Sequence, residues 1–184
     1  GFRDGSGLAA SLAWGACGIA MGTRFMMTKE SPVPHDTKEA YLSANVEDIK
    51  ITKKFDGMSH RLIFNNYIKK IDRSNPISLF IMSITSAWKY KQLTKASYAD
   101  LIKSFFAMLK GDDLTISQSI MSANSPAIIQ KAMVEGSPNE GAMPSGQVAG
   151  LISNLPSCKQ LVDKIMDEFS FAAENFTKLE DDKK

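Results

Sequence analysis

Two glycine-bearing stretches open the sequence, GFRDG at residues 1–5 and GIAMGT at residues 18–23. The apolar, alanine-rich run from Leu8 to Trp14 lies between them and predicts one short helix, with Ser6 as a candidate N-cap. The run 19–21 is brief, apolar and closed by glycine, which is typical of a buried strand in a parallel sheet. The pattern therefore predicts two glycine-bearing strand ends joined by one crossover helix.

Glycine at the end of a strand suits the binding of an anion, because backbone N–H groups can approach closely where no Cβ atom intervenes. The Thr23 hydroxyl adds a donor, and a helix after it would direct its positive end toward the same point. Two adjacent loops of this kind form the phosphate site of a (β/α)₈ barrel. A plain pair of glycine turns explains the spacing equally well.

Three further polar groups have weaker claims to a role. Asp4 is a candidate to brace the first loop by accepting backbone N–H bonds, although a simple turn explains it too. Lys29-Glu30 is a candidate lining for the mouth of the site or a surface ion pair. Asp112-Asp113 is a carboxylate pair that helix capping explains.

Most of the remaining sequence has helical periodicity. The stretch Asp48–Thr52 alternates like a strand and is followed by a turn signal at Gly57. Helices are predicted near 36–44, after the cap-and-proline pairs Asn75-Pro76 and Ser125-Pro126, at 98–109, after Asp113, and from 157 to about 178. We therefore expect a chain made mostly of α-helix, in which the apolar and methionine stripes form the core.

The composition argues against several classes of protein. The 22 basic and 20 acidic residues are interspersed and give a net charge of +2, so no nucleic-acid-binding face is expected. Cys17 and Cys158 lie in unrelated contexts, which predicts two buried free thiols, no metal site, and a reducing compartment such as the cytoplasm or an organellar matrix. The longest apolar stretch, 76–88, is too short to span a bilayer.

Residues 1–31 resemble a segment of the nitronate monooxygenases, also called 2-nitropropane dioxygenases. In that family a glycine turn containing Asp-Gly precedes an alanine-rich helix, and the next strand ends in Met-Gly-Thr-Arg-Phe, as at 21–25 here. The run GQVAGLI at 146–152 is similar to one that precedes the last helix of the family. The resemblance covers roughly residues 1–66 and 135–178, and residues 71–134 have no counterpart in it.

The resemblance implies a fold and a cofactor. The fold would be α/β, the C-terminal part of a (β/α)₈ TIM-type barrel with a helical cap. Residues 1–34 would supply the last strand or strands and the FMN phosphate loops, residues 35–135 the cap and substrate domain, and residues 136–184 helices returning to the barrel. The positions that match the phosphate-binding residues of the family are Gly1, Ala20, Met21, Gly22 and Thr23. Gly1, Gly22 and Thr23 would donate to phosphate oxygens, and the other two would approach through their backbone.

The resemblance also implies an FMN-dependent monooxygenase that oxidises alkyl nitronates with dioxygen. The family's histidine base lies before the segment matched here, and neither His35 nor His60 occupies a motif position, so we assign no catalytic residue. A barrel cannot close with one or two strands, so we expect the other half to come from sequence upstream of Gly1 or from a second polypeptide. Two alternatives stay open: a flavin-dependent enoyl-acyl-carrier-protein reductase, which shares the phosphate motif, and a non-catalytic structural subunit.

Overall fold

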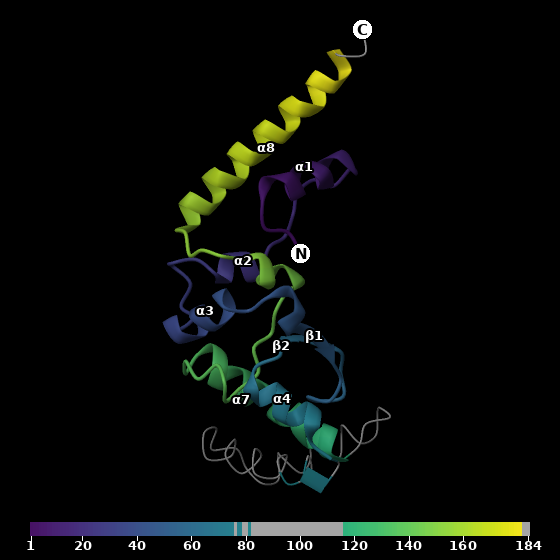
Figure 1. Cartoon of the computed structure of the whole chain (residues 1–184), viewed down its shortest axis with the longest axis vertical. Coiled ribbons are helices and arrows are strands. Elements are labelled where there is room, and N and C mark those ends of the chain that lie inside the picture. The colour runs from purple at the N-terminus through teal and green to yellow at the C-terminus, as the bar shows by residue number, and fades with distance from the viewer. Residues whose placement is uncertain (76, 79–80, 82–115, 182–184) are drawn as a thin grey trace.

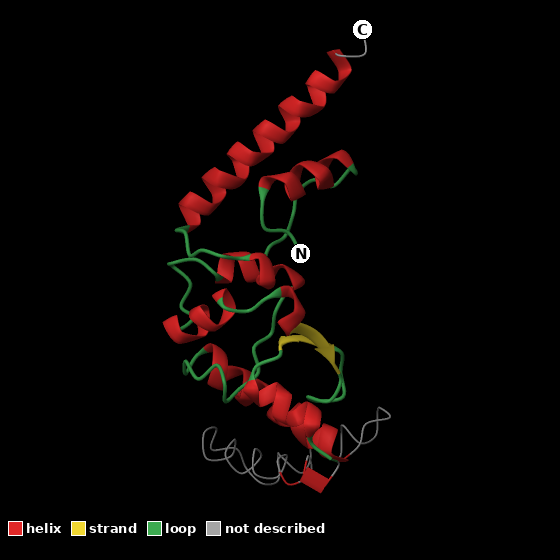
Figure 2. Ribbon diagram, viewed as in Figure 1, coloured by secondary structure: helices red, strands yellow, loops and turns green. Residues whose placement is uncertain are grey.

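The computed structural model describes residues 1–75, 77–78, 81 and 116–181 as an elongated, mostly helical molecule (Figures 1 and 2). The helices are α1 (Gly5–Ala13), α2 (Thr23–Met26), α3 (His35–Leu42), α4 (Asn66–Arg73), α7 (Ile116–Met133) and α8 (Cys158–Asp181). The strands are β1 (Ile49–Thr52) and β2 (His60–Ile63), and short 3₁₀ helices lie at Val46–Asp48 and Gln147–Leu151. None of the described helices has the length and apolarity needed to cross a bilayer. The apolar stripe predicted at 98–109 and the caps at Asp112-Asp113 lie outside the described residues.

Strands β1 and β2 form an antiparallel hairpin in the middle of the molecule (Figure 2). Ile49 pairs with Ile63 and Thr52 with His60. Gly57, in the connection, has a φ of 88°, in the left-handed region that glycine adopts most readily. The strand and the turn predicted at 48–57 are therefore confirmed.

An irregular segment, residues 141–154, runs alongside this hairpin and joins it to the helices. The N–H of Ile63 donates to the carbonyl of Met143 at 3.0 Å, and the N–H of Ser145 donates to the carbonyl of Arg61 at 3.1 Å. From α3, the buried Tyr41 hydroxyl donates to the carbonyl of Pro144. Burial raises the pKa of Tyr41, so the phenol stays protonated and remains a donor.

Helix α1 packs against α8 at one end of the molecule (Figure 1). The Asp4 carboxylate caps α1 by accepting from the N–H of Gly7 at 3.0 Å. The prediction that Ser6 is the N-cap is wrong, because Asp4 is the residue with extended backbone before the first turn. Gly5 lies so close to α8 that a Cβ atom there would overlap the backbone of Ile165 and Phe169.

Three other predictions are wrong. Residues 19–21 form no strand, since a strand exists through its hydrogen bonds to a neighbour and no described segment pairs with this one. The helix predicted to open at Ser125-Pro126 begins at Ile116 and runs through Pro126, and the Ser125 hydroxyl donates to the Asp56 carboxylate at 3.1 Å. Neither cysteine is buried: Cys17 is exposed and Cys158 is partly exposed, and both are free thiols.

The close approach of α1 and α8 predicts the effect of a single methyl group. In the full-length protein, Gly5→Ala should lower the free energy of unfolding by about 2 kcal/mol or more, because the backbones must separate. Urea denaturation measures this change. Gly18→Ala is the matched control, since a Cβ atom at Gly18 meets nothing within 4 Å. Equal effects of the two substitutions would contradict the packing described.

Candidate functional site

The five residues predicted to hold a phosphate are all accessible. Gly1, Ala20 and Gly22 are exposed, and Met21 and Thr23 are partly buried. Gly22 is the N-cap residue of α2, and Thr23 is its first helical residue. Because α2 has only four residues, any grip on an anion here would depend on individual N–H groups more than on a helix dipole.

The two glycine corners, Gly1 and Gly22–Thr23, lie against neighbouring residues of one short stretch, 146–148. A Cβ atom placed on Gly1 would be 3.4 Å from Cγ1 of Val148. A Cβ atom placed on Gly146 would be 3.7 Å from the same Val148 atom and 3.1 Å from Oγ1 of Thr23. Both corners therefore border the short stretch 146–148.

A hydrogen bond ties the second corner to this stretch. The N–H of Gly146 donates to Oγ1 of Thr23 at 2.9 Å. A hydroxyl that accepts one bond can still donate its own hydrogen to another group. The Thr23 side chain is thereby held in place without losing its capacity as a donor.

The space beside Gly22 is open. A Cβ atom there would meet nothing within 4 Å, and the φ of −87° is accessible to any residue. Neither packing nor backbone conformation within the described residues therefore requires glycine at this position. What glycine provides is room for an external group to approach the backbone, which fits a phosphate bound at this corner.

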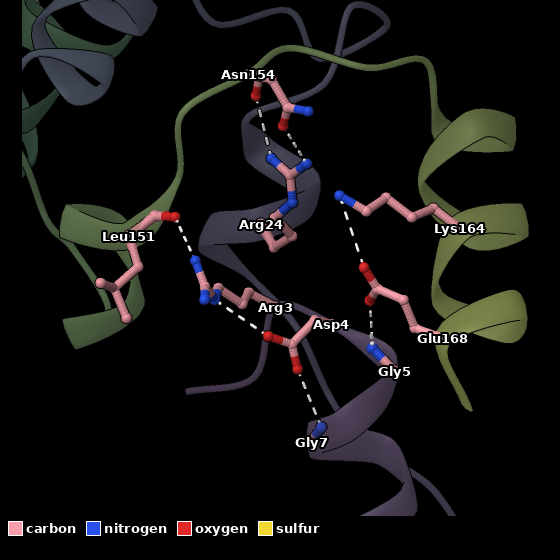
Figure 3. Close-up of polar contacts among 9 residues, drawn as sticks. All are labelled: Arg3, Asp4, Gly5, Gly7, Arg24, Leu151, Asn154, Lys164 and Glu168. Atoms are coloured by element: carbon pink, nitrogen blue, oxygen red, sulfur yellow. Dashed lines mark hydrogen bonds and ion pairs between the residues drawn. The ribbon is translucent and has the colours of Figure 1, made fainter. Parts of the chain in front are cut away.

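A cluster of polar residues includes Arg3 and Arg24, which are close in sequence to the two corners (Figure 3). Arg3 donates to the carbonyl of Leu151 at 2.6 Å and pairs with Asp4 at 3.1 Å. Arg24, immediately after Thr23, donates to the carbonyl and side-chain oxygens of Asn154 at 3.1 and 2.7 Å. The cluster thus anchors both corners to the segment that ends at Asn154.

On the α8 side of the cluster, Glu168 accepts from the N–H of Gly5 at 2.9 Å and lies 3.6 Å from Lys164. Burial, and then repulsion from Arg3, lower the pKa of Arg24, and attraction to Glu168 raises it in part. Arg3, Arg24 and Glu168 were not identified from the sequence as residues that anchor these segments. The available signal was a charged residue, Arg24, followed directly by the apolar run Phe25–Met27.

The cavity between these residues measures about 80 Å³. Ligand pockets have volumes of about 300–1,000 Å³, so this cavity is too small for a mononucleotide. Its lining side chains mostly bond to one another and to the backbone. The cluster therefore has a structural role: it holds the segments that carry the candidate site.

A second tie holds the chain after α2 to the start of α8. Both oxygens of Glu30 lie 2.9 Å from the N–H of Cys158, the first residue of α8. Hydrogen bonding from the Cys158 backbone lowers the pKa of Glu30. Glu30 therefore caps α8 from a distance, a role that neither interpretation of Lys29-Glu30 included.

The two histidines lie away from the corners. His35 begins α3, is exposed, and pairs with Glu39 at 3.0 Å. His60 bonds to the buried carboxylate of Asp56 at 2.8 Å, and the Ser125 hydroxyl also points to Asp56. The Asp56 carboxylate is therefore the group that His60 and Ser125 share.

The family model for nitronate monooxygenase matches residues 1–168. The chain belongs to this family, whose members are flavin-dependent TIM-barrel enzymes. It is also similar, with a TM-score of 0.61 and 25% identity, to the structure of FabK from Thermotoga maritima, over 97% of this chain and 45% of that one. The family expected from the sequence is confirmed.

Curated relatives divide into two groups. The (3aS,4S,5R,7aS)-5-hydroxy-7a-methyl-1-oxo-octahydro-1H-indene-4-carboxyl-CoA dehydrogenase of Rhodococcus jostii is 42% identical over 166 residues, which are 90% of this chain and 47% of the relative. The enzyme of that name from Mycobacterium tuberculosis is 38% identical over the same length. A probable nitronate monooxygenase from Staphylococcus aureus is 34% identical over 73 residues, 40% of this chain and 21% of the relative. The chain spans about half the length of the dehydrogenases it matches.

The Glu30 tie predicts a pH-dependent contribution to stability. Because its pKa is lowered in the folded state, the ionised carboxylate stabilises the fold above its unfolded pKa, and this contribution disappears as the pH falls through the folded pKa. The melting temperature of wild type should therefore exceed that of Glu30→Gln at neutral pH, and the gap should close on acidification. Thermal melts across the acidic range measure it, and a gap of constant size would contradict the assignment.

Proposed function

We propose that this chain is part of a flavin-dependent oxidoreductase that acts on a coenzyme A thioester. The observation that carries this proposal is the contrast between the relatives: similarity to the carboxyl-CoA dehydrogenases extends over 90% of the chain, whereas similarity to the probable nitronate monooxygenase covers 40%. Residues beyond the phosphate corners, which would contribute to substrate selection, are thus shared with the dehydrogenases.

We propose FMN as the cofactor, with its phosphate held at the two corners. The N–H groups of Gly1, Gly22 and Thr23 and the Thr23 hydroxyl would donate to phosphate oxygens, while Ala20 and Met21 would line the approach through their backbone. The open space beside Gly22 and the position of both corners along the stretch 146–148 support this arrangement. When bound, the flavin would supply the capacity to accept a hydride from the substrate.

The contribution of this chain would be to grip the cofactor and orient it. We assign no catalytic residue here, so the base would come from the rest of the barrel. Exposed apolar side chains on α1 and α8 support a neighbour at this end of the molecule; they include Leu12, Val162, Met166 and Phe171. The remaining barrel half would be provided by upstream sequence or by a second polypeptide.

Oxidation of alkyl nitronates with dioxygen is the second candidate, favoured by the description of the family model and by the Staphylococcus aureus relative. The two candidates differ in the substrate that reduces the flavin. We expect anaerobic bleaching of the flavin absorbance of the full-length protein by a hydroxyacyl-CoA and none by a simple alkyl nitronate. Bleaching by the nitronate alone would favour the second candidate, and a protein purified without flavin would favour the structural subunit.

The phosphate corner predicts a specific loss of cofactor. In Gly22→Val the branched side chain would occupy the space through which the phosphate reaches the backbone, so FMN affinity should fall about tenfold or more, about 1.4 kcal/mol. Fluorescence titration of the deflavinated protein measures the affinity. Gly18→Val is the control, because its neighbourhood is equally open but it does not match a phosphate position. Unchanged FMN affinity in Gly22→Val would place the phosphate elsewhere.

A further inference from the structure

Helix α4 lies on the opposite side of the β1–β2 hairpin from α2 (Figure 1). Residues of its C-terminal half line a basic groove. Its volume of about 540 Å³ falls within the range of about 300–1,000 Å³ for ligand pockets. Lys69, Lys70 and Arg73 contribute three positive charges to its lining, and the remaining lining residues are serines and asparagines. No acidic side chain is among the described residues that line it.

The ordinary explanation of these cations is the helix dipole, because basic residues at a helix C-terminus are stabilising. That explanation does not account for their arrangement. Lys69 and Arg73 are four residues apart in α4, where like charges repel. The acid next to them in sequence, Asp72, instead pairs with Lys54 from the hairpin connection at 3.3 Å. Within the described part of the chain, no carboxylate lies within ion-pair distance of the three cations.

Two polar residues that follow α4 in the chain complete the lining of the groove. Asn75 lines it together with Ser78, whose N–H and hydroxyl donate to Oδ1 of Asn75 at 2.8 and 2.9 Å. These bonds fix Asn75 and Ser78 relative to each other in the groove that also contains the charged end of α4. A groove with fixed polar walls and an excess of three cations is suited to a polyanion that carries several phosphates.

We propose that this groove binds the nucleotide end of coenzyme A, with Lys69, Lys70 and Arg73 contacting its phosphates. The inference rests on the proposed action on a CoA thioester. Coenzyme A carries a diphosphate and a 3′-phosphate at one end and its thiol at the other end of an extended arm. A phosphate site set apart from the flavin corners is therefore compatible with such a substrate.

Binding of free CoA to the flavin-loaded full-length protein tests the inference without turnover. By isothermal titration calorimetry, Lys69→Gln combined with Arg73→Gln should weaken CoA binding about tenfold or more. Wild type should also bind dephospho-CoA, which lacks the 3′-phosphate, more weakly than CoA, and the double variant should lose most of this discrimination. All three cations are exposed, so flavin content and melting temperature should be unchanged.

Lys159→Gln is the control, because it removes an exposed lysine on α8, far from the groove, and should leave CoA binding unaltered. Equal CoA affinity in wild type and the double variant, or no CoA binding by wild type, would overturn the inference. The proposed function has a separate readout, the reduction of the flavin by a hydroxyacyl-CoA. If the groove variants bind CoA as tightly as wild type and a hydroxyacyl-CoA still reduces the flavin, the groove is not the CoA site. The proposed activity would then stand.

Discussion

The described structure depends on satisfying the backbone of one irregular segment, residues 141–154. This stretch has little regular secondary structure of its own, so its buried N–H and carbonyl groups need partners from elsewhere in the chain. The partners come from several separate segments: Ile128 and Asn65 at its start, β2 and Tyr41 in its middle, and Thr23, Arg3 and Arg24 toward its end. A buried amide left without a partner costs about 1–3 kcal/mol, so these bonds restrict how the elements can be arranged.

Hydrogen bonds to residues 141–154 position the candidate site. Thr23 is fixed by Gly146, and the Gly1 corner is held through Arg3 on Leu151. The loops at Gly1 and at Gly22–Thr23 are thus positioned by residues that lie more than a hundred positions further along the chain. If a phosphate binds at these corners as proposed, long-range hydrogen bonds would already hold the donors in position before the ligand arrives.

The sequence predicted those features that depend on local periodicity and on turn chemistry. Helix α8, the strand at 49–52 and the turn at Gly57 were found in this way. The strand at 19–21 was not, because its formation depends on neighbours that periodicity does not reveal. The helix start predicted at Ser125-Pro126 is wrong because α7 already runs through Pro126 from Ile116, and tertiary packing holds the proline inside the helix against its local preference.

The same distinction holds for the candidate site. The sequence allowed three separate motifs to be selected, at residues 1–5, 18–23 and 146–152. It did not reveal the contact between Thr23 and Gly146, because these residues lie far apart in the sequence. Arg24 was not identified because its hydrogen-bond partner, Asn154, belongs to a segment far along the chain. The central proposal is that the amides of the two corners bind one phosphate.

A crystal structure of the full-length, flavin-loaded protein tests that proposal most directly. We predict a flavin phosphate with its oxygens within hydrogen-bonding distance of the backbone N–H groups of Gly22 and Thr23 and of the Gly1 corner. A flavin phosphate held elsewhere, with Gly22 facing solvent or protein, would contradict the account.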